Sequence, residues 1–299
     1  KIGLFWLRND FRLLKNDGLI EATKNHDQVV VFYLYKAETY NNQEAQKWWL
    51  SKSLFNFRRK LDRLNISLEI LETNSFKIFF DKLTKKQDFN IYWNKVYVPD
   101  FLKFDKYLIN NLKNKNIIYK KFKGNALNET DEIKKSDGTP FKVFTPFWRN
   151  AEKYYLEKIP SKEKKILKCE KRISFFDNTI DEKQIYPKKK WFKKFEKYWE
   201  PSEEKALKEL KNFIKHRVEN YSETRNFPDL IGTSRLSPYI KHGQIHVETI
   251  WEECSKIKKK GIDKFLSEIG WREFNHSLIN YFPHMLTNNY SKKFDNFPW

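Results

Sequence analysis

The chain has 299 residues, of which 39% are hydrophobic and 17% aromatic. This apolar content is enough for a folded core, so the composition argues against a disordered protein. Its 59 Lys and Arg exceed its 39 Asp and Glu, and the net charge of +20 favours nucleic acid or an anionic membrane as partner. A general bias of the source organism toward lysine would give the same excess. No apolar run reaches membrane-spanning length and the first residues show no signal-peptide pattern, so the sequence argues against a membrane protein.

Five short apolar runs in the first part of the chain predict β-strands, at residues 2–7, 28–35, 67–72, 90–93 and 116–122. Helical patterns lie between them, most clearly at residues 44–64 and 101–112. Such alternation is typical of a doubly wound α/β fold, so we expect a parallel five-stranded sheet in an N-terminal domain over residues 1–123. No G-x-G-x-x-G follows the first strand, so the usual dinucleotide fingerprint is missing and we do not assign NAD.

Residues 124–190 lose this alternation, with a turn cluster at 136–140 and a helix predicted at 146–156, and we expect them to form a connector. From residue 191 onward the patterns are helical, at residues 203–218, 238–242, 247–258 and 263–282, which predicts an all-helical domain over residues 191–299. Cys169 and Cys254 are far apart, and the histidines do not group with carboxylates. We therefore expect free thiols in a reducing compartment and no metal site.

The stretch TSRLSP, residues 233–238, precedes one of these helices. Ser237 is predicted as the N-cap, Pro238 as the first helical residue and Gly243 as the residue after the end. The polar side chains near this helix start are those of Thr233, Ser234, Arg235 and Ser237. Hydroxyl groups, a guanidinium and free backbone N–H groups can hold a phosphate. A capped surface helix that binds nothing is the alternative, and these residues alone favour it.

The helix predicted at residues 263–282 brings four side chains to one face, because they are spaced at positions 0, 3, 4 and 7. They are Glu268, Trp271, Arg272 and Asn275. A flat ring flanked by an acid, a guanidinium and an amide suits a base taken out of its stack, which is held by stacking and read along its polar edge. A solvated face with a half-buried Trp271 and a Glu268–Arg272 ion pair fits these residues equally well.

Two residues upstream are weaker candidates. Tyr221 can anchor an adenine or a phosphate, or it can be an ordinary core residue of an amphipathic segment. Arg225 can meet a DNA phosphate, or it can be a solvated charge. Each residue taken alone favours the plain structural reading.

Four ordered segments together resemble the DNA photolyase/cryptochrome family. They are FWLRNDFRLLKNDGL at residues 5–19, GTPFKVFTPFWR at 138–149, YSETRNFPDLIGTSRLSPYIKHGQI at 221–245 and FLSEIGWREFNHSLINYFPH at 265–284. The resemblance implies an N-terminal antenna domain and a C-terminal helical domain that holds FAD. The residues that it places at FAD are Tyr221, Thr233, Ser234, Arg235, Leu236, Ser237 and Phe265, with Phe265 lining the flavin cavity.

The same resemblance implies contacts to DNA that contains pyrimidine dimers. The residues placed at the DNA are Arg225, Glu268, Trp271, Arg272 and Asn275. Glu268 and Trp271 are the catalytic candidates, since they match the residues that hydrogen-bond to the flipped dimer and stack on it. A protonated Glu268 would stabilise the dimer radical anion by a hydrogen bond, and otherwise it would orient the dimer.

The activity that follows from the resemblance is that of a deoxyribodipyrimidine photolyase, a carbon–carbon lyase that repairs cyclobutane dimers with light and reduced FAD. A cryptochrome-like blue-light sensor, a (6-4) photoproduct enzyme and a truncated, non-catalytic fragment are the alternatives. The family continues beyond the last residues of this chain, so we expect the helical domain to be incomplete and FAD binding to be weak or absent.

The resemblance also implies a second, antenna chromophore. Asp100 and Phe101 stand where folate-using members of the family carry an Asn-Glu pair, which makes a folate doubtful and leaves a deazaflavin type, or no antenna, open. We further expect a monomer in a bacterial-type cytoplasm, associated with the nucleoid through DNA and with no membrane partner.

Overall fold

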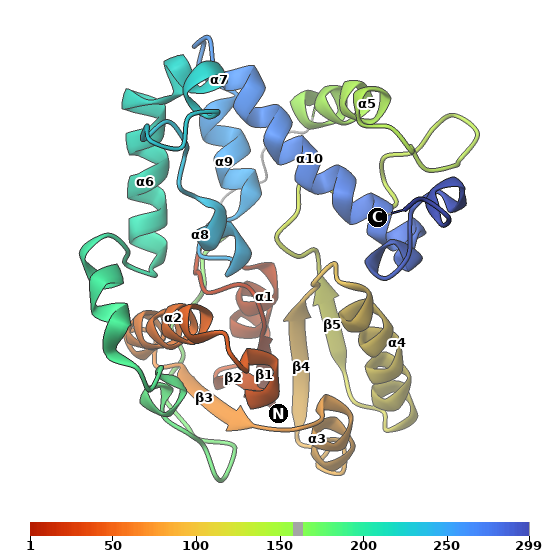
Figure 1. Cartoon of the computed structure of the whole chain (residues 1–299). Helices are drawn as coiled ribbons and strands as arrows, with labels where there is room; N and C mark the ends of the chain where they lie inside the picture. Colours follow the sequence, from red (N-terminus) through yellow and green to blue (C-terminus); the bar gives the residue numbers. More distant parts are fainter. Residues whose placement is uncertain (158–163, 299) are drawn as a thin grey trace.

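A sheet layer lies at one end of the molecule and a set of helices at the other in the computed structural model, which describes residues 1–157 and 164–298 (Figure 1). The strands are β1 (Ile2–Leu7), β2 (Val29–Tyr35), β3 (Ser67–Glu72), β4 (Phe89–Asn94) and β5 (Tyr119–Phe122). All strand pairs are parallel and the order is β3-β2-β1-β4-β5, so the predicted doubly wound five-stranded sheet is confirmed.

Strand β5 begins three residues later than predicted. Asn116 has a φ of +55°, and the N–H of Ile117 donates to the carbonyl of Leu112. Both features close a helix end, so the first residues of the apolar run belong to the turn before the strand.

Four helices cover the sheet, two on each face. They are α1 (Asp17–Asn25), α2 (Glu44–Asp62), α3 (Phe76–Leu83) and α4 (Pro99–Asn114). Leu54 of α2 packs in one buried cluster with Val31 of β2, whereas Leu108 of α4 packs in another with the neighbouring Val30. Successive residues of β2 therefore face opposite layers of the fold, as a strand covered on both sides requires.

The second part of the chain is mainly helical. Its helices are α5 (Phe144–Glu157), α6 (Glu203–His216), α7 (Tyr221–Thr224), α8 (Ser237–Lys241), α9 (Val247–Cys254) and α10 (Ile262–Tyr281). Helix α9 ends at Cys254, four residues before its predicted end, because the chain turns there and the N–H of Ile257 donates to the carbonyl of Cys254. Helix α6 likewise ends at His216, and a short 3₁₀ turn follows it.

Short 3₁₀ helices complete the fold. They are η1 (Ala37–Tyr40), η2 (Glu182–Ile185), η3 (Lys190–Lys197), η4 (Val218–Asn220), η5 (Pro283–Leu286) and η6 (Lys292–Phe294). Residues 173–180 run along the β3 edge of the sheet, where Ile180 bridges Ile70 and the N–H of Phe176 donates to Glu69 Oε2 at 2.8 Å. Residues 158–163 of the predicted connector lie outside the described residues. The domain limits at residues 123 and 190 stay predictions.

The loop after β1 fastens the sheet layer to the helices. Buried Arg12 donates from Nη1 to the carbonyl oxygen of Gly243 at 3.0 Å. Glu203, at the start of α6, accepts the backbone N–H groups of Leu13 and Leu14 at 3.0 and 2.9 Å. A set of polar contacts thus occupies the place of the glycine-rich turn that dinucleotide-binding folds carry after their first strand.

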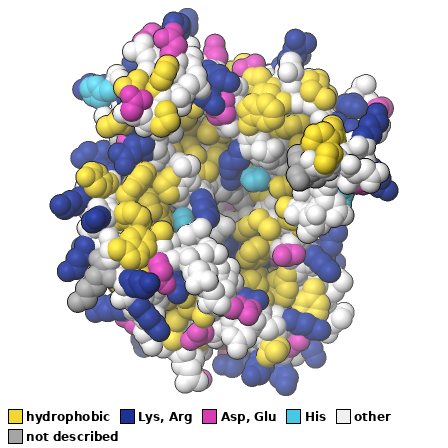
Figure 2. Space-filling view, viewed as in Figure 1, with side chains coloured by type: hydrophobic (Ala, Val, Ile, Leu, Met, Phe, Trp, Pro, Cys, Tyr) yellow, Lys and Arg dark blue, Asp and Glu magenta, His cyan; other side chains and the backbone are white. Residues whose placement is uncertain are grey.

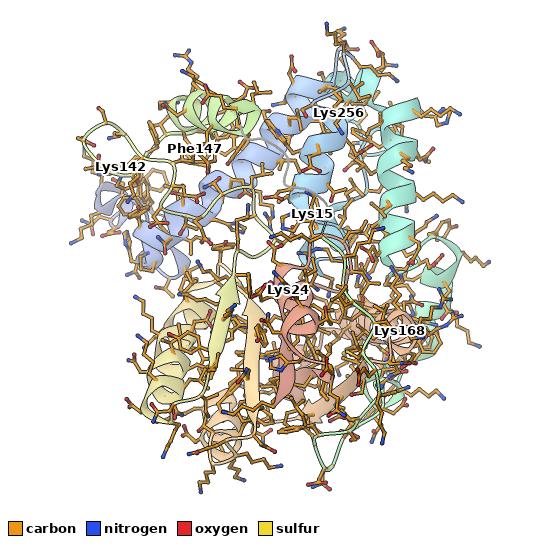
Figure 3. All side chains as sticks on the ribbon, turned by 180° about the vertical axis from the view of Figure 1, so that it is seen from behind. Lys15, Lys24, Lys142, Phe147, Lys168 and Lys256 are labelled. Atoms are coloured by element: carbon orange, nitrogen blue, oxygen red, sulfur yellow. The ribbon has the colours of Figure 1, made fainter. Side chains whose placement is uncertain are left out.

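Charged side chains cover much of the surface. Figure 2 shows lysine and arginine side chains around the margin of one face, and this face is hollowed between the helices and the sheet layer. In the view from behind, Lys15 lies between the sheet layer and helix α9 (Figure 3), and its Nζ is 2.7 Å from Glu252 Oε1. Part of the lysine excess therefore forms ion pairs inside the protein and is not free for a partner.

Candidate functional site

The segment 233–237, before and at the start of α8, presents polar side chains on an irregular turn. Arg235 has a φ of +58°, and its guanidinium lies 4.4 Å from the centre of the Trp199 ring. The N–H of Leu236 donates to Ser234 Oγ at 3.4 Å, and the Leu236 side chain is fully buried. Thr233 and Ser237 are exposed. One buried side chain therefore anchors the turn, while the hydroxyl groups and the guanidinium lie nearer to solvent.

The predicted N-cap at Ser237 is wrong. Helix α8 begins at Ser237 itself, its N-cap is Leu236, and no side chain caps it. Its five residues form little more than one turn, so its dipole adds little to the binding of an anion. The predicted end is confirmed, since Gly243 follows the C-cap residue His242 with a φ of +64°.

Tyr221 and Phe265 lie in the core of the helical part. Their rings meet edge to face at 5.5 Å, and both contact the ring of Phe213. Burial raises the pKa of the Tyr221 hydroxyl above its ordinary value. These contacts fit the plain structural reading of Tyr221 and place both rings in the buried cluster that also contains Leu236, not on an open surface.

The four residues predicted to share a face of α10 are all at least partly exposed. Trp271 has 41% of its surface exposed, and Asn275 is exposed as well. The Glu268–Arg272 ion pair of the alternative interpretation is not formed. Glu268 accepts from Arg225 and from Lys264, the latter at 3.1 Å, whereas Arg272 donates to Glu273 at 2.7 Å.

Arg225 and Lys264 also decide the charge of Glu268. Partial burial alone would raise the pKa of this carboxyl, but the hydrogen bonds and charges of the two cations outweigh burial and lower the pKa below its ordinary value. Glu268 is therefore ionised in this arrangement and accepts hydrogen bonds. The alternative in which it donates a proton needs a partner that first displaces the cations.

Phe144 is a residue of this surface that the sequence analysis did not assign. It is the first residue of α5, and its ring lies parallel to that of Trp271, with centroids 3.8 Å apart and an angle of 10°. The two residues are 127 positions apart, so no local spacing connects them. The segment 138–149 contributed to the family resemblance, and that was the only signal at this position.

Glu273 was also missed, because it lies on the buried side of α10. It is 2% exposed, accepts from Arg272, and accepts the backbone N–H of Leu127 at 2.9 Å. Burial raises the pKa of this carboxyl, and the nearby Arg272 only partly offsets the effect. Glu273 ties the segment after β5 to the helix that carries Trp271.

A second candidate site is a pocket of about 620 Å³ outside the carboxyl ends of β1 and β2. Its walls include Arg8, Asn9, Tyr40, Phe101, Lys241 and His242. The Arg8 guanidinium bonds Asp105 and lies 3.8 Å from the centre of the Trp6 ring, and its buried Nε has no partner in the described structure. Ligands of open α/β sheets bind at this edge, so the pocket with its aromatic walls suits a flat ring.

Among the described residues, no group of histidine, cysteine and carboxylate side chains has the arrangement of a metal site. Both cysteines are free and buried. In the same residues no helix is long and apolar enough to cross a membrane.

Comparison with known proteins gives consistent matches. A family model described as DNA photolyase matches residues 3–164. The deoxyribodipyrimidine photo-lyase of Agrobacterium fabrum is 29% identical over 300 residues, which cover 99% of this chain and 63% of that relative. This chain thus spans less than two thirds of the relative's length.

Two solved structures share the fold. The class III photolyase from Agrobacterium tumefaciens has a TM-score of 0.88 at 29% identity, and the match covers 99% of this chain and 62% of that one. The archaeal photolyase from Sulfolobus tokodaii, described with two FAD molecules, has a TM-score of 0.77 at 21% identity, covering 100% of this chain and 64% of that one.

Proposed function

This chain belongs to the DNA photolyase family, and on that premise we propose that it takes part in the light-driven repair of cyclobutane pyrimidine dimers in DNA. The observation that carries the proposal is the surface around Trp271 on α10. An exposed indole beside an ionised Glu268 offers a stacking face and a hydrogen-bond acceptor to a base that leaves the duplex.

Charges near that surface support binding of a DNA backbone. Arg225 and Arg272 are partly exposed, and each is held by one carboxylate, Glu268 or Glu273. The net charge of +20 adds a salt-dependent attraction to phosphates. In this proposal Trp271 stacks on the flipped dimer, Glu268 orients it, and Asn275 extends the same face.

The residues before α8 fit the phosphates of FAD, the cofactor that members of this family bind. Together with Ser237, the first residue of α8, they offer three hydroxyl groups and a guanidinium, which are donors that suit a diphosphate. Arg235 would bind the phosphates and Trp199 would keep its guanidinium in place. When bound, FAD would supply light absorption and the electron that starts the splitting of the dimer. Tyr221 and Phe265 would close the site from the core side.

The pocket at the sheet edge is our candidate for a second chromophore. Tyr40, Phe101 and Phe104 give it aromatic walls, and Lys241 adds a cation to the lining. Asp100 and Phe101 both line the pocket where folate-using members carry an Asn-Glu pair. A flavin-type or deazaflavin-type ring therefore suits these walls better than a folate.

The test of DNA recognition compares two variants of exposed tryptophans. Trp271 and Trp191 have 41% and 39% of their surfaces exposed, so Trp191→Ala is a matched control for Trp271→Ala. Binding to an oligonucleotide with one thymine dimer, and to the same oligonucleotide undamaged, is measured by fluorescence polarisation. Base stacking on an aromatic ring is worth about 1–3 kcal/mol, so Trp271→Ala should weaken dimer binding about 5- to 150-fold.

Equal losses of affinity for both oligonucleotides in Trp271→Ala would remove the stacking role.

The cofactor is tested separately, by the absorption spectrum of the purified chain between the near-ultraviolet and the blue with added FAD. Loss of dimers from the bound oligonucleotide under blue light, with reduced FAD, tests repair itself. Flavin photoreduction without any preference for the dimer would favour the cryptochrome-like sensor instead.

A further inference from the structure

The indole of Trp271 has one covered face. The Phe144 ring lies parallel to it at 3.8 Å between centroids, with an angle of 10°, while 41% of the Trp271 surface stays exposed. Phe144 covers one face of the indole, so a base can stack only on the part of the ring that Phe144 leaves exposed. Stacked rings attract each other by about 0.5–1.5 kcal/mol beyond the effect of burial.

Other rings hold Phe144 itself in place. Trp148, one turn further along α5, is nearly parallel to Phe144 at 6.1 Å, and Phe274 of α10 meets it edge to face at 5.9 Å. The α10 backbone has no side chain at Gly270, where a Cβ would lie 2.2 Å from Trp148 Cε3. Helix α5 therefore packs closely on α10 (Figure 1), and Phe144 is fixed from both helices.

We propose that Phe144 is a positioning residue of the Trp271 surface, which holds the indole in one orientation and restricts base stacking to its open face. An exposed side chain loses rotamer freedom when it binds a partner, at a cost of about 0.5–1.5 kcal/mol. Stacking on Phe144 removes that freedom before the base arrives, so binding of the base no longer carries this cost. The proposal rests on the proposed function, because it assumes that Trp271 receives a base.

The proposal changes which part of the chain forms the recognition surface. Trp271 and Glu268 lie on α10, but Phe144 belongs to the segment between the sheet and the later helices. The same segment is also tied to α10 at Leu127, through Glu273. The orientation of the recognition ring thus depends on residues far from it in sequence.

The test uses three changes in the full chain. Phe144→Leu keeps an apolar side chain and removes the flat ring, Phe144→Tyr keeps the ring, and Val143→Ala removes an adjacent side chain that is 62% exposed. Affinities for the dimer-containing and the undamaged oligonucleotide are measured for each, with circular dichroism to confirm folding. We expect Phe144→Leu to weaken dimer binding about 2- to 12-fold, with undamaged binding unchanged. Phe144→Tyr and Val143→Ala should match the parent protein.

The double variant Phe144→Leu/Trp271→Ala should bind the dimer no more weakly than Trp271→Ala alone, since Phe144 acts only through Trp271. Independent losses in the double variant, equal losses on both oligonucleotides, or no loss in Phe144→Leu would overturn the proposal. Failure of the proposed function gives another pattern, in which Trp271→Ala itself leaves the preference for the dimer unchanged.

Discussion

Replacing Gly243 with alanine should lower the free energy of unfolding far more than the same change at Gly138. Both residues have a positive φ, +64° for Gly243 and +77° for Gly138. A Cβ at Gly243 would lie 1.8 Å from the carbonyl oxygen of Asn9, whereas no heavy atom of the described chain lies within 4 Å of a Cβ at Gly138. The two variants therefore separate the steric conflict from the cost of the backbone conformation.

The expected magnitude follows from these geometries. A left-handed conformation costs a non-glycine residue about 1–2 kcal/mol, and the stiffer unfolded chain returns about 0.4–1 kcal/mol, so Gly138→Ala should lose about 0–1.5 kcal/mol. At Gly243 the loop after β1 must also move, which adds about 1–3 kcal/mol for overpacking. The bond from Arg12 to the Gly243 carbonyl, worth about 1 kcal/mol, is weakened with it. We expect Gly243→Ala to lose about 2–4 kcal/mol more than Gly138→Ala.

Urea unfolding followed by far-ultraviolet circular dichroism measures the free energy of unfolding of both variants. Similar m-values would show that the two variants expose a similar surface area on unfolding. A difference below about 0.5 kcal/mol, which is within the usual error of additivity, would refute the close approach of the β1 loop to the end of α8.

Two further changes test other parts of the site. Glu273→Gln should keep an acceptor for the Leu127 N–H and remove the counter-charge of Arg272. Burial raises the pKa of Glu273, so its carboxyl group binds a proton more tightly in the folded protein than in the unfolded chain. The contribution of Glu273 to stability therefore falls as the pH rises from the ordinary pKa of 4.5 through the raised pKa of the folded protein. The stability of Glu273→Gln relative to the parent should therefore increase over this window, and a difference that does not change with pH in urea titrations would contradict the assignment. Arg235→Ala should lower flavin occupancy in the absorption spectrum, while Arg149→Ala, a change of an exposed arginine on α5, should not. Unchanged occupancy in Arg235→Ala would remove Arg235 from the phosphate site.

Much of the sheet could be predicted because buried parallel strands are continuous apolar runs between turn signals. The α10 face could be predicted too, since helical periodicity places Glu268 and Trp271 on one side. The start of β5 could not, because Asn116 closes a helix with a positive φ that an apolar run does not reveal. The prediction of Ser237 as the N-cap of α8 was wrong for a similar reason. The backbone turns at Arg235 with a positive φ and brings Leu236 into the N-cap position.

The partners of the α10 residues were beyond local rules. Spacing favours Arg272 as the partner of Glu268, yet Glu268 accepts from Arg225, 43 positions away, because α7 packs beside α10. The contact between Phe144 and Trp271 spans an even longer stretch of chain. Local patterns predict which side chains share an element, whereas packing between elements decides which side chains meet.

Helix α8 belongs to both candidate sites. The turn that leads into Ser237 carries the polar groups proposed to bind phosphate, while Lys241 and His242, about 6 Å further along the helix axis, line the pocket at the sheet edge. Trp49 makes a second connection, since its ring stacks on His242 and meets Trp199, the ring beneath Arg235. A ligand that shifts α8 from one side changes the free energy of binding on the other. Thermodynamic reciprocity then requires that the second ligand alter the affinity for the first by the same factor.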